Sequence, residues 1–300
     1  MAEVREIIAA ELKLTKVEPW KRLKGGCSSN NWAFKTETGA IFAKIDSDRH
    51  SGDLLLGEMK SLEMLQSSES VRVPSPIKII FSQNTTILIT EYVKFKGLDV
   101  FQGELGQQLA MLHLRNLQLL KENTDQAVKQ FGFYVNTCCG KIPIDNQWNE
   151  DWINFYCKQR LKPQVEMAAK MSGNREVEKL WSQLEPKIKE LFHGVNVLPS
   201  LLHGDLWSGN AGETESEPVI FDPASFYGHH EFDLAITRMF GGFCKEFYQR
   251  YHQLVPREVG FEERKSLYEL FHYLNHWNHF GGAYEEQSLE IMRRLVANSQ

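Results

Sequence analysis

A short stretch of the chain, residues 203–210, contains side chains that can do chemistry. It reads His-Gly-Asp-Leu-Trp-Ser-Gly-Asn and is followed by Phe-Asp-Pro at 221–223. A carboxylate that accepts a hydroxyl proton, followed by an amide and a second carboxylate that hold Mg²⁺, is the set of groups that phosphoryl transfer from ATP uses. We therefore interpret Asp205 as the catalytic residue, and Asn210 and Asp222 as the metal ligands.

The chain around this stretch should fold back on itself. Residues 198–202 lead into the loop, and residues 218–221 are predicted to form a short strand that leads to Asp222. A hairpin-like return of this kind would bring Asp222 beside Asn210. Protein kinases have an arginine at the position of Gly204, and the variant seen in this chain is typical of kinases that phosphorylate small molecules.

Lys44 and Glu58 are candidates for an ion pair. Lys44 lies on a predicted strand, and Glu58 falls on the apolar face of the helix predicted over 54–66. An unpaired carboxylate on an apolar face is costly, so Glu58 should have a cationic partner. In kinases such a pair holds the lysine on the phosphates of ATP. The alternative is that Lys44 extends to solvent and Glu58 is simply solvated.

Gly25, Gly26, Cys27 and Ser28 precede the first predicted strand pair. Glycines let backbone N–H groups approach phosphate oxygens, and serine adds a donor, so we assign these residues to ATP binding. A plain hairpin turn is the commoner meaning of a Gly-Gly pair. An exposed Cys27 thiol close to Lys44 would favour the thiolate, although Cys27 could also be an incidental small residue.

Residues 90–93, Thr-Glu-Tyr-Val, end the last strand predicted in the first part of the chain. A kinase hinge would offer backbone groups to adenine at this point. The Glu91 carbonyl and the Val93 N–H are the candidates, and their position in the chain is the reason for choosing them.

Residues 271–280 are rich in aromatic, histidine and asparagine side chains and are predicted to be helical. A zinc site is not favoured there, because the histidines lack nearby acidic or cysteine ligands. A buried helix is the plain interpretation. The mixture also suits a polyol, whose hydroxyls need hydrogen bonds and whose C–H faces need aromatic surface, so we interpret Trp207, His276 and Trp277 as walls for a sugar.

Composition excludes several classes of protein. The formal net charge of −5 argues against a broad nucleic-acid-binding surface, and no apolar run is long enough to span a membrane. The five cysteines are odd in number and irregular in spacing, which argues against a disulfide framework or a zinc module. We therefore expect a cytoplasmic protein that binds neither nucleic acid nor membrane.

The predicted elements divide the chain into two parts, 1–93 and 94–300. The first is rich in strands, predicted at 32–36, 40–46, 77–81 and 86–93, and we expect it to bind ATP. The second is helical, with helices predicted at 104–114, 147–157, 175–192, 231–240 and 262–280, and we expect it to hold the catalytic and substrate residues. Pro186 is expected to disturb the third of these helices.

With these residues in place, the chain resembles the fructosamine kinase family, also called ketosamine-3-kinases, over nearly its full length. The motifs that carry the resemblance are Gly25-Gly-Cys27, Phe42-Ala-Lys44, Gly57-Glu-Met59, Val73-Pro-Ser-Pro76, Phe131-Gly-Phe133, Thr137-Cys-Cys-Gly140, Trp148-x-x-Asp151-Trp152, Leu202 to Asn210, Asp222 to His229, and Tyr273 to Gly281.

The resemblance implies a bilobal α+β fold of the aminoglycoside and choline kinase type, with ATP and Mg²⁺ as cofactors. It implies phosphorylation of the 3-hydroxyl of a ketosamine, the rearranged adduct of a sugar with an amine such as a protein lysine. The phosphate then eliminates and releases the amine, which initiates deglycation. Some relatives form disulfide-linked dimers through the glycine-loop cysteine, so we expect either a monomer or a homodimer linked through Cys27.

Two other functions stay open at this point. One is a kinase of another small alcohol, such as an aminoglycoside or choline. The other is a non-catalytic nucleotide-binding scaffold, which the joint presence of Lys44, Glu58, Asp205, Asn210 and Asp222 argues against. Among ketosamines our preference is ribulosamine, with psicosamine and fructosamine as alternatives, because the choice depends on small differences in pocket shape.

Overall fold

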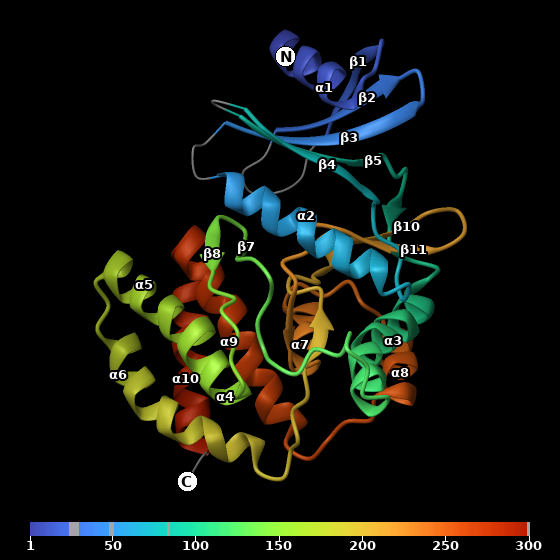
Figure 1. The fold of residues 1–300 in the computed structure, drawn as a ribbon. Coiled ribbons are helices and arrows are strands. Elements are labelled where there is room, and N and C mark those ends of the chain that lie inside the picture. The colour runs from blue at the N-terminus through green and yellow to red at the C-terminus, as the bar shows by residue number, and fades with distance from the viewer. Residues whose placement is uncertain (24–29, 48–50, 83–84, 299–300) are drawn as a thin grey trace.

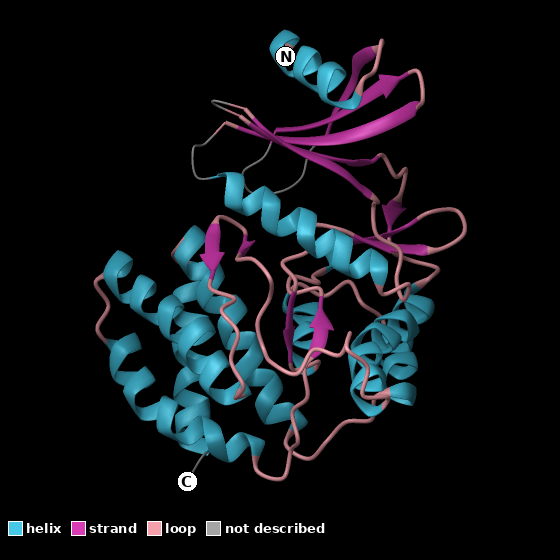
Figure 2. Ribbon diagram, viewed as in Figure 1, coloured by secondary structure: helices cyan, strands magenta, loops and turns pink. Residues whose placement is uncertain are grey.

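The computed structural model describes residues 1–23, 30–47, 51–82 and 85–298, and they form two stacked parts (Figure 1). A strand-rich part contains the N-terminus, and a larger helical part contains the C-terminus (Figure 2). Helix α2, Ser51–Ser67, lies between the sheet above it and the helices below it. In the described part of the chain, no helix is both long and apolar enough to cross a membrane.

The first part is an antiparallel sheet with strand order β1-β2-β3-β5-β4. Its strands are β1 Val17–Leu23, β2 Asn30–Thr36, β3 Gly39–Asp46, β4 Pro76–Phe81 and β5 Thr86–Glu91. The predicted strand pairs are thereby confirmed. Helix α1, Ala2–Leu12, packs its buried Ile8 against one sheet face, and α2 packs Leu55 against Leu88 on the other.

Side-chain alternation along β3 decides which face Lys44 occupies. Ile41, Ala43 and Ile45 belong to the apolar cluster on the α1 side. Because successive residues of a strand point to opposite faces, Lys44 points to the α2 side. The strand therefore turns Lys44 toward the helix that carries Glu58.

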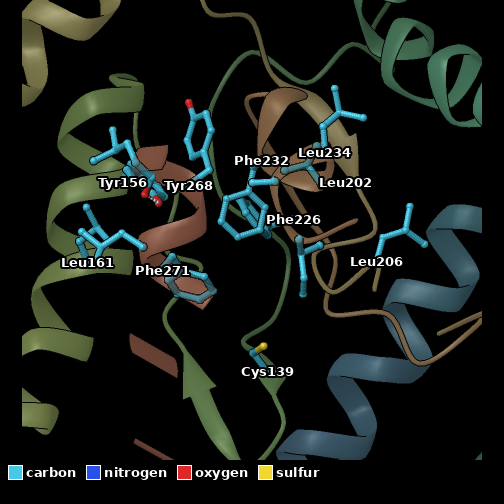
Figure 3. Close-up of a cluster of buried hydrophobic side chains, with 14 of the residues drawn as sticks. Cys139, Tyr156, Leu161, Leu202, Leu206, Phe226, Phe232, Leu234, Tyr268 and Phe271 are labelled. Carbon is cyan, nitrogen blue, oxygen red and sulfur yellow. Dashed lines mark hydrogen bonds between the residues drawn. The ribbon is translucent and has the colours of Figure 1, made fainter. Parts of the chain in front are cut away.

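The second part is built mainly from helices around a large apolar core (Figure 3). The helices are α3 Gln102–Lys121, α4 Trp152–Phe155, α5 Lys162–Ser172, α6 Glu176–Leu184, α7 Glu231–Met239, α8 Lys245–Leu254, α9 Phe261–Phe280 and α10 Ala283–Asn298. Phe226, Phe232, Tyr268 and Phe271 gather where α7 and α9 meet, and each is at most 1% exposed.

Short strands in the second part carry the loops of interest. Strand β9, Ser200–Leu202, pairs with β12, Phe226–Gly228. Strand β10, Ala211–Glu213, pairs with β11, Pro218–Ile220, and with β6, Lys96–Gly97. Strands β7, Thr137–Cys139, and β8, Ile142–Ile144, form a separate hairpin.

Two of the predicted helices need correction. The helix predicted at 147–157 begins only at Trp152, because Asn149 forms a backbone bridge with Phe131 and the Asp151 carboxylate caps the first turn. The helix predicted at 175–192 is α only as far as Leu184. It tightens to a 3₁₀ helix over Glu185–Phe192, where Pro186 removes a backbone donor, as expected.

Candidate active site

His203 joins the catalytic loop to the segment that carries Asp222. Its Nε2 donates to the Phe221 carbonyl at 3.0 Å, and its Nδ1 accepts from the Asp205 N–H at 3.2 Å. These two bonds require a neutral ring with the proton on Nε2. Burial lowers the pKa of His203, which is consistent with that form. The imidazole is therefore a fixed bridge between the two segments.

Asp233 on α7 holds the same loop from the other side. Its Oδ2 accepts the His203 N–H at 2.7 Å and its Oδ1 accepts the Gly204 N–H at 2.8 Å. His113 on α3 approaches Oδ2 at 3.2 Å. Burial by itself would raise the pKa of Asp233, but the interactions with His113, and then those with His203 and the Gly204 N–H, together outweigh burial and lower it. Asp233 therefore braces the catalytic loop from α7.

Gly204 has no room for a side chain. Its φ of +86° lies in the left-handed region, and an added Cβ would lie 2.1 Å from the Ala224 carbonyl oxygen. The absence of arginine at this position is thus explained by backbone packing.

Asp205, Asn210 and Asp222 come together as the predicted return requires. The Asn210 side chain donates Nδ2–H bonds to the Asp205 carbonyl at 2.8 Å and to Asp205 Oδ2 at 3.1 Å. The Phe221 N–H donates to the Asn210 carbonyl at 3.0 Å, which brings the next residue, Asp222, back to the loop. Asp222 has φ +56°, a strained value for a residue other than glycine that is typical of functional sites.

Lys44 makes ion pairs with residues of both parts of the molecule. Its Nζ lies 2.6 Å from Glu58 Oε1, 2.7 Å from Glu58 Oε2 and 2.6 Å from Asp222 Oδ1. The Lys44 side chain is 7% exposed and that of Glu58 is 11% exposed. The predicted Lys44–Glu58 pair is present, and the contact with Asp222 was not predicted.

The carboxylates of the site have unequal environments. Burial and then the charge of Asp222 raise the pKa of Asp205 to about 7. Lys44 is also buried, but the charges of Asp222 and Glu58 outweigh the burial, so its pKa is raised and it stays protonated. Among the carboxylates of Asp205, Asp222 and Glu58, that of Asp205 is the one without Lys44 as a cationic partner, which suits a proton acceptor.

The candidate hinge lies where β5 leaves the sheet. Glu91 ends β5, and its side chain is held by Arg72 Nη2 at 2.5 Å and by the Ser75 N–H at 3.2 Å. The Glu91 carbonyl accepts a 3.1 Å bond from the Thr90 hydroxyl. Val93 follows in the connection to β6. The side chain of Glu91 therefore fixes the start of this connection, while the role of its backbone in adenine binding stays a prediction.

Aromatic rings line the other side of the catalytic loop. Trp207 is 37% exposed and meets Phe240 edge-on, with ring centroids 5.6 Å apart. His276 on α9 lies 5.1 Å from the Phe240 ring and 5.1 Å from the Tyr284 ring. Trp207 and His276 are thus joined through Phe240, which the sequence interpretation did not include.

Trp277 does not join this group. It is 4% exposed and belongs to the apolar core. Adjacent residues of a helix point about 100° apart, so a helix that turns His276 toward Phe240 turns Trp277 elsewhere. We correct its assignment from a sugar wall to a core residue.

The candidate phosphate-binding residues Gly25, Gly26, Cys27 and Ser28 lie outside the described residues. Their assignment to ATP, and the redox role considered for Cys27, stay predictions. The other cysteines, Cys138, Cys139, Cys157 and Cys244, are free thiols.

The metal assignment can be tested against the donor atoms. Asn210 turns its Nδ2 toward Asp205, so its side-chain oxygen is directed away from that carboxylate. One carboxylate oxygen of Asp222, Oδ1, contacts Lys44 Nζ, and the Asp222 side chain is 28% exposed. An amide oxygen and a carboxylate oxygen are the hard ligands that Mg²⁺ prefers, so this pair fits the ion.

Two positioning residues could not be read from the sequence. His113 lies far from Asp233 in the chain, and only the packing of α3 against the helical part brings them together. Phe240 follows α7 without any local motif. A buried histidine can be suspected from its place on the apolar face of a helix, but its partner cannot.

Comparison with known proteins gives a consistent result. The family model described as fructosamine kinase matches residues 1–298. The chain is 45% identical to a mouse (Mus musculus) ketosamine-3-kinase, covering 96% of this chain and 98% of the relative.

Two solved structures have the same fold. A candidate fructosamine-3-kinase of Haemophilus somnus 129PT has a TM-score of 0.82 at 23% identity, covering 97% of this chain and 96% of that one. A thermostable mutant of the aminoglycoside phosphotransferase APH(4)-Ia, in a ternary complex with ADP and hygromycin B, has a TM-score of 0.61 at 14% identity, covering 98% of each chain. The predicted fold class is thereby confirmed.

Proposed function

The chain belongs to the fructosamine kinase family, and on that premise we propose that it transfers the γ-phosphoryl group of ATP to the 3-hydroxyl of a ketosamine. One observation supports this most strongly. The carboxylate Asp205, with no cationic partner among the site groups, lies next to Asn210 and Asp222, and Asp222 shares Lys44 with Glu58. This is the arrangement of charges that phosphoryl transfer to an alcohol requires.

The proposed mechanism depends on positioning and electrostatics. The Asp205 carboxylate orients the sugar hydroxyl and accepts its proton as the oxygen bonds to the γ-phosphorus and the bond to the β-phosphate oxygen breaks. Lys44, held by Glu58, binds the phosphates. Mg²⁺, held by Asn210 and Asp222, would neutralise charge on the phosphates when bound. The proton thus passes to Asp205, and ADP is the leaving group.

The aromatic residues beside the catalytic loop support a sugar as the acceptor. Trp207 and Phe240 offer exposed ring surface, and His276 lies beside them with Nδ1 bonded to the His272 carbonyl at 2.8 Å. Because Nδ1 donates to that carbonyl, Nε2 is the nitrogen left to hydrogen-bond a hydroxyl. Aromatic faces with a polar group at one edge suit the C–H and O–H groups of a sugar on an amine.

The test is a substrate panel. The purified protein is given Mg²⁺-ATP with the ribulosamine, psicosamine and fructosamine of one lysine derivative, and ADP and the phosphorylated sugar are measured. We expect turnover, with the highest kcat/KM for ribulosamine. Asp205→Asn should lower kcat by roughly 10²- to 10⁴-fold, since it removes the general base, while ATP binding is kept.

The panel also includes an aminoglycoside and choline. Turnover of one of these with no turnover of any ketosamine would overturn the proposed acceptor. ATP binding without transfer to any alcohol would indicate a nucleotide-binding scaffold. A cytoplasmic location and a Cys27-linked homodimer are kept as further proposals, and the second is tested by non-reducing electrophoresis after peroxide treatment.

A further inference from the structure

The hairpin of β7 and β8 contributes a residue to the catalytic loop. Along β7, Thr137 is 0% exposed and Cys139 is 2% exposed, while Cys138 between them is partly exposed. This alternation turns Cys139 inward, and Figure 3 shows it at the edge of the apolar core, below Leu202 and Leu206. A buried thiol on a strand has a fixed direction, since the backbone and the packing both restrain it.

The base of the hairpin is held by a buried arginine. Arg160 is 1% exposed and lies between the rings of Phe155 and Phe226, at 4.4 and 4.2 Å from their centroids. Its Nη2 donates to Asn146 Oδ1 at 2.5 Å, and Asn146 Nδ2 donates to the Thr137 hydroxyl at 2.9 Å. These contacts link the apolar core to the first residue of β7.

Neighbouring elements also pack closely on the hairpin. A Cβ added to Gly57 of α2 would lie 2.7 Å from the Asn136 carbonyl oxygen, so α2 touches the backbone at the start of β7. At the turn, the Lys141 N–H donates to His279 Nε2 of α9 at 2.9 Å. The hairpin is therefore fixed between the helix that carries Glu58 and the helix that carries His276.

The inward thiol meets the catalytic carboxylate. Cys139 and Asp205 form a side-chain hydrogen bond, in which the S–H donates to a carboxylate oxygen. Asn210 supplies the other side-chain donor, at 3.1 Å from Oδ2. We propose that Cys139 is a positioning residue, whose thiol and the Asn210 amide together fix the direction in which Asp205 presents its carboxylate to the acceptor hydroxyl.

The chemistry of the two donors suits this task. A carboxylate has about four lone-pair positions, and two donors leave the others for the acceptor hydroxyl. A thiol is a weak and neutral donor, so it restrains the carboxylate without the strong pairing that a lysine or arginine would give. The proposal deepens the proposed kinase function and rests on it for the identity of the acceptor.

The first test compares Cys139→Ala with Cys139→Ser. Alanine removes the donor, and we expect kcat to fall by roughly 10- to 100-fold because a misdirected base lowers the rate of the chemical step. The KM values for ATP and for the ketosamine should change by less than about twofold. Serine keeps a hydrogen-bond donor at this position, with an O–H in place of the S–H. We therefore expect Cys139→Ser to recover most of the kcat that Cys139→Ala loses.

The matched control is Cys138→Ala, on the same strand but facing the other way. We expect wild-type kcat and KM from it. A purely structural role for Cys139 predicts that serine, a polar group in a buried position, is no better than alanine, and that result would overturn the proposal. Wild-type kcat in Cys139→Ala would overturn it too.

A double-mutant cycle asks whether Cys139 acts through Asp205. In single-turnover measurements, Cys139→Ala should cost nothing further in an Asp205→Asn background. An additive loss would show that Cys139 acts elsewhere and would contradict the proposal.

A final measurement needs no acceptor. The infrared difference between the wild type and Cys139→Ala isolates the S–H stretch of this thiol, and a bond to the Asp205 carboxylate lowers its frequency. We expect Asp205→Asn to shift the band upward, and an unchanged band would overturn the proposal. Because this readout is independent of turnover, failure of the ketosamine assay and failure of the positioning role are distinguishable.

Discussion

The region proposed to face the nucleotide and the region proposed to face the acceptor are built from different kinds of side chain. The first consists of buried charges, with Lys44 within 2.7 Å of oxygens on both Glu58 and Asp222. The second consists of rings, with Trp207 and Phe240 at 37% and 42% exposure. The phosphate chain of ATP needs fixed charges, whereas a sugar needs surface that can cover its C–H faces.

The two regions also differ in where their residues come from. The charged group combines a strand and a helix of the first part of the chain with Asp222 of the second. The aromatic group comes from the second part alone. With the proposed roles, nucleotide binding should depend on how the two parts meet, while acceptor choice should depend on residues of the helical part alone. The first two of the following changes should each affect one region and spare the other, and the third tests the junction between the two parts.

The largest effect should come from Lys44→Met. It removes the cation between Glu58 and Asp222 and leaves two acidic side chains close together, so we expect kcat/KM for ATP to fall by about 10²-fold or more. Loss of one partner of a buried pair should also cost roughly 3 kcal/mol of unfolding free energy. Steady-state kinetics and urea unfolding measure the two effects.

The control for that change is Lys78→Met, because Lys78 pairs with Glu11 at 2.7 Å on an exposed surface where both side chains are at least 40% exposed. We expect kinetics and stability close to the wild type. An ATP KM that is equally unaffected in Lys44→Met would contradict the role given to the buried cluster.

A smaller effect should follow from Phe240→Ala. Phe240 contacts both Trp207 and His276, so its loss should raise the KM for the ketosamine by roughly tenfold, the value of about one aromatic contact. The KM for ATP should not change. Phe81→Ala serves as the control, since Phe81 is 59% exposed at the end of β4. A rise in the KM for ATP instead would break the division between the two regions.

The smallest effect should come from Glu213→Gln, at the junction of the two parts. Glu213 is 1% exposed, accepts the N–H groups of Asp99 and Phe101 at 2.9 and 3.0 Å, and pairs with Lys96 at 3.0 Å. Burial opposes ionisation, but these backbone hydrogen bonds outweigh it and lower the pKa of Glu213 to about 2.

A pKa lowered by folding gives stability that is present above the unfolded pKa of about 4.5. That stability is lost as the pH falls from there toward 2. We expect the wild-type melting temperature to drop over this window, and the Glu213→Gln protein to have a lower melting temperature at neutral pH and a shallower drop. Equal slopes in the two thermal melts would show that Glu213 is not the group responsible.

The sequence predicted the parts of the site that follow from local pattern. Strand alternation and an apolar helix face were enough to pair Lys44 with Glu58, and the strand predicted at 218–221 was enough to predict the return of Asp222. The contacts of His113 with Asp233 and of Cys139 with Asp205 depend on how distant elements pack, which no local pattern contains. Trp277 was misassigned because the composition of residues 271–280 suited a sugar. On α9 its side chain points into the core, about 100° around the helix from that of His276.

The lack of space at Gly204 bears on how such an enzyme can be controlled. Protein kinases that are switched on by phosphorylation order an activation segment through new contacts between a phosphate and arginine. Here residue 204 cannot carry an arginine, and the chain after Asp222 is buried from Pro223 to His229. A modifying kinase could not reach a hydroxyl in that segment without unfolding it. The packing of residues 223–229 therefore argues against control by phosphorylation of this segment.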